Sequence, residues 1–75
     1  MRCHFNLVDR YETLVDEDGV EVETIERAHT LALEVAREML AQDPARIESW
    51  RGWRLEATDR SGVVLFTIRL DALVS

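Results

Sequence analysis

The sequence predicts an α+β fold in the order ββαββ, with a four-stranded antiparallel sheet and one helix packed on one of its faces. Two observations predict it. A long amphipathic stretch occupies the middle of the chain, and segments of alternating apolar and polar residues lie on both sides of it. With 75 residues, the chain has room for one core only, so residues 1–75 are expected to form a single small domain.

The helix is expected from about residue 25 to residue 42. Thr24 is a suitable N-cap, and Glu26 lies in the first turn, where the helix dipole favours an acid. Pro44 ends the helix, because the residue before a proline avoids the α region. The apolar face is broad, and we expect four of its residues to pack on the sheet: Ala28, Ala32, Val35 and Met39.

Two short strands are expected before the helix. Cys3, Phe5 and Leu7 alternate with polar or smaller residues, which is typical of a half-buried strand, and residues 13–15 return as a second one. An acidic loop follows, residues 16–19, in which Gly19 is free to take a positive φ. Val20 and Val22 then add a short extended piece.

A hairpin is expected after the helix, over residues 53–70. Its first strand alternates Trp53, Leu55 and Ala57 with polar residues. Residues 59–62 form the turn, with an acid at its first position and Gly at its fourth. One helix covers only one face of such a sheet, so the other face is left to water or to a partner.

The charge is acidic and unevenly distributed. The chain carries a net charge of −6; residues 1–43 hold four Arg against eleven acids, and residues 44–75 hold five Arg against four acids. This balance argues against nucleic acid and anionic membranes as partners. The start of the chain has no apolar signal segment, the longest apolar run is too short to cross a membrane, and Cys3 is the only cysteine. A cytoplasmic protein is therefore expected.

The residues able to bind metal or act as nucleophiles do not form a recognisable motif. Cys3, His4 and His29 lack zinc-ligand spacing, and Cys3 and His4 point to opposite faces of a strand. When Gly19 is aligned with the invariant glycine of a calcium loop, Leu14 and Ile25 fall at positions that require oxygen ligands. No catalytic residue, cofactor or metal site is therefore expected. A weak, water-rich cation site in the acidic loop stays an alternative.

Trp50 and Trp53 lie among arginines, as in surfaces that stack nucleic-acid bases. Trp53, however, is in phase with the apolar residues of its strand, which places it in the core. The pattern does not decide whether Trp50 is buried.

The sequence also resembles a bacterial family of short proteins of unknown function. The resemblance rests on an aromatic-containing first strand (residues 5–7), an Asp-Glu-x-Gly turn (residues 16–19), an Ala-rich helix (residues 28–36) and a Thr-Asp-x-x-Gly hairpin (residues 58–62). Asn6 stands where this family usually has His. The resemblance implies no activity, because the family has none established.

The function expected from these observations is that of a non-catalytic interaction module, either self-associating as a homodimer or bound to another protein. The expected contact surface is the uncovered sheet face, with Trp50, Val63 and Leu65 as its apolar part. An acidic, antitoxin-like regulator that neutralises a basic partner or binds nucleic acid as an oligomer is the alternative. A binder of a small ligand or metal is the third possibility.

Overall fold

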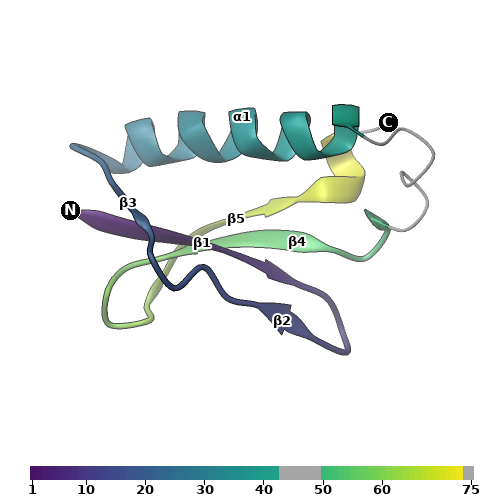
Figure 1. Ribbon diagram of the computed structural model, residues 1–75, viewed down its shortest axis with the longest axis horizontal. Helices are drawn as coiled ribbons and strands as arrows, with labels where there is room; N and C mark the ends of the chain where they lie inside the picture. The colour runs from purple at the N-terminus through teal and green to yellow at the C-terminus, as the bar shows by residue number, and fades with distance from the viewer. Residues whose placement is uncertain (43–49, 74–75) are drawn as a thin grey trace.

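The computed structural model describes residues 1–42 and 50–73. Its elements in chain order are β1 (Arg2–Val8), β2 (Thr13–Leu14), β3 (Val20–Glu21), α1 (Ile25–Gln42), β4 (Arg54–Thr58), β5 (Val64–Arg69) and the 3-10 helix η2 (Leu70–Leu73). The fold is α+β, with an open antiparallel sheet of five strands and α1 along one of its sides (Figure 1). Neither α1 nor η2 combines the length and apolar character that a membrane-spanning helix needs.

The sheet differs from the predicted one by a strand. Its order is β2-β1-β4-β5, and β3 also pairs with β1. The element order is therefore βββαββ, and the prediction of four strands was wrong. Val20 was expected to be extended. Apolar and polar residues that alternate over so few positions, however, do not show that a segment pairs with another strand. The pairing becomes visible only when Cys3 is found opposite Val20.

The helix begins where the sequence predicts. Thr24 Oγ1 accepts the backbone N–H of Arg27 at 3.0 Å, and the carbonyl of Thr24 accepts the N–H of Ala28. These bonds satisfy donors that have no partner inside the helix. The predicted stop at Asp43-Pro44 lies outside the described residues.

The core lies between α1 and the sheet. One cluster consists of Ala32, Ala36, Leu55, Ile68 and Leu70, and the other of Cys3, Val22, Ala28 and Ala57. The helix contributes mainly alanines, spaced four residues apart, so its backbone lies close to the sheet.

The predicted buried stripe of the helix is partly wrong. Ala28 and Ala32 are fully buried and Met39 is half-buried, but Val35 is 37% exposed. The period of the sequence defines a broad apolar face, and it leaves open which part of that face points at the sheet. Ala36 and Leu40 take the buried positions instead.

The β4–β5 hairpin is confirmed, with one irregularity. Asp59 Oδ1 accepts the N–H groups of Ser61 at 2.8 Å and Val63 at 3.0 Å, which fixes the turn. A register shift lies between Ala57 and Thr58, where Ala57 pairs with Phe66 and Thr58 with Val64. Leu65 is therefore the extra residue of a β-bulge.

Candidate functional site

One edge of β1 is paired with two short strands instead of one long strand. Leu7 lies opposite Leu14 in β2, and Cys3 lies opposite Val20 in β3. Between these two pairs, β1 has three residues. The segment that connects β2 to β3 has five, residues 15–19. Two extra residues must therefore bulge out of the ladder, and the backbone groups that they leave need other partners.

Asp16 supplies most of those partners. Its Oδ2 accepts the backbone N–H of Phe5 at 3.2 Å, and its Oδ1 accepts the N–H of Gly19 at 3.1 Å. Its own backbone is held as well, because Asn6 Oδ1 accepts the Asp16 N–H at 2.9 Å. His4 Nδ1 lies 2.7 Å from the carbonyl oxygen of Asp16. A carbonyl oxygen only accepts, so Nδ1 carries the proton and donates it.

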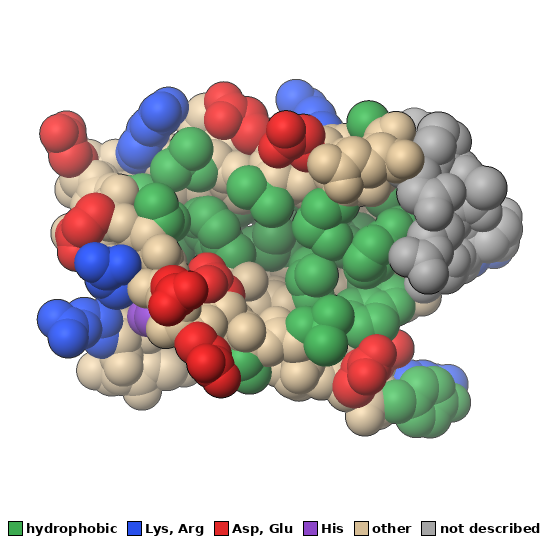
Figure 2. Space-filling view, in the orientation of Figure 1, with side chains coloured by type: hydrophobic (Ala, Val, Ile, Leu, Met, Phe, Trp, Pro, Cys, Tyr) green, Lys and Arg blue, Asp and Glu red, His purple; other side chains and the backbone are tan. Residues whose placement is uncertain are grey.

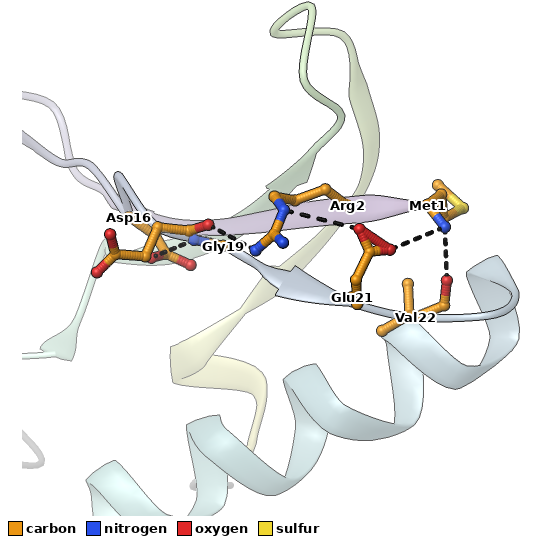
Figure 3. Close-up of polar contacts among 7 residues, drawn as sticks. Met1, Arg2, Asp16, Gly19, Glu21 and Val22 are labelled. Carbon is orange, nitrogen blue, oxygen red and sulfur yellow. Dashed lines mark hydrogen bonds and ion pairs between the residues drawn. The ribbon is translucent and has the colours of Figure 1, made fainter.

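The loop closes tightly over His4 because residue 19 is glycine. Gly19 has φ of 70°, and a Cβ added there would lie 2.9 Å from His4 Cε1 and 3.0 Å from the carbonyl oxygen of Cys3. Both the backbone conformation and the space therefore exclude a side chain. Further along the same edge, Arg2 donates to the Asp18 carbonyl at 3.0 Å and Glu21 pairs with Arg2 and with the amino group of Met1 (Figure 3).

A shallow polar hollow of about 360 Å³ lies beside this loop, on the face of the sheet away from α1. Its lining consists of His4, Asn6, Val15, Asp16, Glu17, Thr58, Asp59, Arg60 and Gly62. Asn6 Nδ2 donates to Thr58 Oγ1 at 3.4 Å, and its Oδ1 is used by Asp16. Asp16 and Asp59 accept from backbone N–H groups. These bonds hold loops and turns, which is a structural role.

The other predicted metal or nucleophile candidates do not converge. Within the described residues no three His, Cys, Asp or Glu side chains form a group able to hold a metal ion. Cys3 is fully buried. Burial raises the pKa of its thiol and the charge of Asp16 raises it further, which disfavours the nucleophilic thiolate. His29 packs edge-on against Phe66 of β5 at 5.1 Å between ring centres, at the rim of the sheet as expected.

The three residues predicted as an interface lie in different surroundings. Trp50 is half-buried, meets Trp53 at 5.7 Å between ring centres, and packs against the first core cluster. Leu65 packs against the second cluster. Val63 is 57% exposed, in the turn before β5. Two of the three therefore contribute to the core of the domain.

Among the described residues, Asp71 in η2 is a second side chain whose pKa is shifted. Arg69 donates to Asp71 at 3.1 Å, and this hydrogen bond lowers the pKa of the Asp71 carboxyl. The Arg69 side chain is 73% exposed and the Asp71 side chain 27%, and the two residues are only two positions apart, so the pair is a local contact.

Sequence reasoning missed an apolar surface that arises because α1 covers one sheet face only in part. The helix packs on β4 and β5. A helix is about 10 Å wide and strands are about 4.8 Å apart, so one helix shields about two strands. The cover thins toward β2: Cys3 at the start of β1 is fully buried with Ala28 of α1, Phe5 and Leu7 are half-buried, and Leu14 of β2 is 50% exposed.

Six apolar side chains border this thinly covered region. Phe5 and Leu7 come from β1, and Leu14 lies opposite Leu7 on the same face. On α1, Leu31, Val35 and Met39 are spaced by one turn and form the edge of the helix nearest β1, since Leu31 packs with the Cys3 cluster. Leu14 is 50% exposed and the others are half-buried or, for Val35, 37% exposed. We call these six residues the apolar band; the space-filling view shows it as a continuous hydrophobic surface (Figure 2).

Carboxylates border the apolar band on both sides. On α1, the exposed Glu34 and Glu38 lie one turn after Leu31 and Val35. On the sheet side, Glu12 and Asp18 are exposed in the segments that flank β2. Acidic side chains are seen above and below the band in Figure 2, with arginines at the left, along the top edge and at the lower right.

The family comparison covers this whole arrangement. A model of the family DUF6894, described as a domain of unknown function, matches residues 2–71. The chain belongs to this family. The match includes every strand of the sheet and α1, and it confirms the resemblance to a family of unknown function. No curated protein and no solved structure matches the chain. Its function is therefore not known from relatives, and nothing found supports the antitoxin-like alternative.

Proposed function

We propose that this DUF6894 domain is a non-catalytic protein-interaction module whose contact surface is the apolar band. The observation that carries the proposal is the partly covered sheet face, with Phe5, Leu7 and Leu14 on one side and Leu31, Val35 and Met39 on the other. Contiguous apolar surface that is bordered by polar residues is typical of interaction sites.

The polar side of the domain supports a non-catalytic role. The carboxylate of Asp16 accepts two backbone N–H groups that close the interrupted edge of β1. The raised pKa of Cys3 keeps that thiol protonated. The Asp16 carboxylate therefore stabilises the fold, and the Cys3 thiol is buried in its unreactive form.

Comparative capture tests the proposal. The wild-type domain and two double variants, Leu14→Ser/Val35→Ser and Val63→Ser/Val64→Ser, are immobilised in equal amounts and exposed to lysate of the cells that produce the protein. Each double variant replaces two exposed apolar side chains, so the second is a matched control. We expect a partner that is retained by the wild type and the control and lost by the first variant. Equal capture by all three proteins would exclude the apolar band as the contact surface.

Self-association is a second candidate, favoured by the outer edge of β5. No described strand pairs with this edge, and Val63 and Val64 beside it are 57% and 48% exposed. A second copy placed by a two-fold axis matches such an edge with its own. Sedimentation equilibrium at about tens of micromolar then shows a dimer that Val64→Lys dissociates and Leu14→Lys, in the strand at the opposite edge of the sheet, does not. A monomer of 8.7 kDa for all three proteins contradicts self-association.

A further inference from the structure

We propose that the occupant of the apolar band is an amphipathic helix of a partner protein with Lys and Arg on its polar face. The inference rests on the proposed function and specifies the chemistry of the partner. It follows from the width of the partly covered surface and from the charge around it.

The width of the surface fits one helix. In the described structure α1 lies over β4 and β5, which leaves Phe5 and Leu7 of β1 half-buried and Leu14 of β2 50% exposed. Because neighbouring strands are about 4.8 Å apart, two strands form a surface about 10 Å wide. A helix with its side chains has about the same diameter. Two helices side by side are the ordinary cover for a sheet of this width, and a partner helix next to α1 would complete that layer.

The apolar side chains are arranged to receive such a helix. Leu31, Val35 and Met39 are about one turn apart along α1 and form a row inclined by about 26° to its axis. Phe5, Leu7 and Leu14 form the floor from the sheet side. A helix laid on the floor beside this row buries one apolar stripe against both, in the manner of helix-in-groove recognition.

The charge around the band selects a basic helix. Glu34 and Glu38 line the helix side, and Glu12 and Asp18 lie on the sheet side, all of them exposed. The basic groups nearby are fewer. Arg10 is exposed in the same segment as Glu12, Arg27 lies at the start of α1, and Arg2 is paired with Glu21. A second copy of this chain, with a net charge of −6, would bring its own acidic borders against these. Like charges across an interface suppress that pairing, whereas Lys and Arg complement it.

Synthetic peptides test the inference. Three peptides of the length of α1 carry the same helical stripe of Leu, and their polar positions are Lys, Glu or Gln. Binding to the full chain is measured by fluorescence anisotropy at about 50 mM and about 500 mM salt. We expect the Lys peptide to bind at least about tenfold more tightly than the Gln peptide and the Glu peptide not to bind. We also expect the affinity of the Lys peptide to fall at high salt.

Two matched variant pairs separate contact at the band from general attraction to an acidic protein. Neither Leu14→Ser/Val35→Ser nor Val63→Ser/Val64→Ser changes the net charge. We expect the first double variant to lose binding of the Lys peptide and the second to retain it. Glu38→Gln, beside Val35, is expected to weaken binding several-fold, and Glu26→Gln, in the first turn of the same helix and turned about 120° away from Glu38, to have no effect. Equal binding of all three peptides, equal effects within either pair, or no binding of the Lys peptide overturns the inference. The comparative capture experiment then decides separately whether the apolar band is a contact surface at all.

Discussion

Asn6 and Asp16 are joined across the interrupted edge of the sheet: the side-chain oxygen of Asn6 accepts the backbone N–H of Asp16 at 2.9 Å. In return the Asp16 carboxylate accepts the N–H of Phe5 in β1 and the N–H of Gly19 beyond the bulge. The bulge thus replaces ladder bonds with side-chain bonds. It holds β2 and β3 on the same strand, and Leu14 of β2 thereby reaches the apolar band.

Asp16→Ala should therefore destabilise the domain. The variant leaves two backbone N–H groups without their acceptor, at a cost of about 1–3 kcal/mol in free energy of unfolding. Urea unfolding followed by tryptophan fluorescence measures this cost. Asp18→Ala is the control, because Asp18 is exposed and its backbone carbonyl, not its carboxylate, accepts from Arg2. Equal stability of the two variants would refute the role given to Asp16.

Gly19→Ala should cost more than Gly62→Ala. Both glycines have a positive φ, 70° and 88°, so both substitutions strain the backbone, by about 1 kcal/mol. Only the Cβ at position 19 also meets His4 and the Cys3 carbonyl at 3.0 Å or less, while no atom lies within 4 Å at position 62. The comparison is made by urea unfolding. If Gly62→Ala proves the more damaging, the close approach of the acidic loop to β1 is not as described.

Ala32→Asp should unfold the domain, and Val35→Asp should not. Ala32 is fully buried in the first core cluster, so an aspartate there places an unpaired charge in the core, at a cost of several kcal/mol. Val35 is 37% exposed, and its carboxylate substitute stays in water. Circular dichroism melts distinguish the two. A folded Ala32→Asp variant together with an unfolded Val35→Asp variant would show that the helix is rotated from its described position.

Cys3 should react slowly with a thiol reagent in the folded protein. Burial and the charge of Asp16 raise the pKa of this thiol above its ordinary value. In the unfolded chain the Cys3 thiol ionises at its ordinary pKa. The free energy of unfolding is therefore unaffected by this group below that pH and declines as the pH rises above it. Ellman's reagent at neutral pH measures the accessible thiolate, and the same sample in urea gives the unprotected rate. Equal rates in the two solutions would contradict the burial of Cys3.

The helix was predictable because its signals are local. Thr24 caps it as expected, and the alternation in residues 53–70 gave the hairpin. The fifth strand was not predictable, because two residues carry too little alternation and the bulge that brings Val20 opposite Cys3 depends on Asp16 contacts. The interface suggested from Val63 and Leu65 assumed an unbroken alternation, and the bulge at Leu65 breaks it. The apolar band depends on where α1 crosses the sheet, which no local pattern encodes.

The most direct test of the central claim is the solvent exposure of the band side chains in solution. Methyl groups are observed by NMR in the presence of a dissolved nitroxide, whose relaxation effect falls steeply with distance. We predict strong effects on Leu14 and Val35, intermediate effects on Leu7 and Leu31, and weak effects on Leu55 and Ile68, which are 1% and 7% exposed. Protection of Leu14 and Val35 equal to that of Leu55 would show that the domain covers the apolar band itself, and would contradict its role as a contact surface.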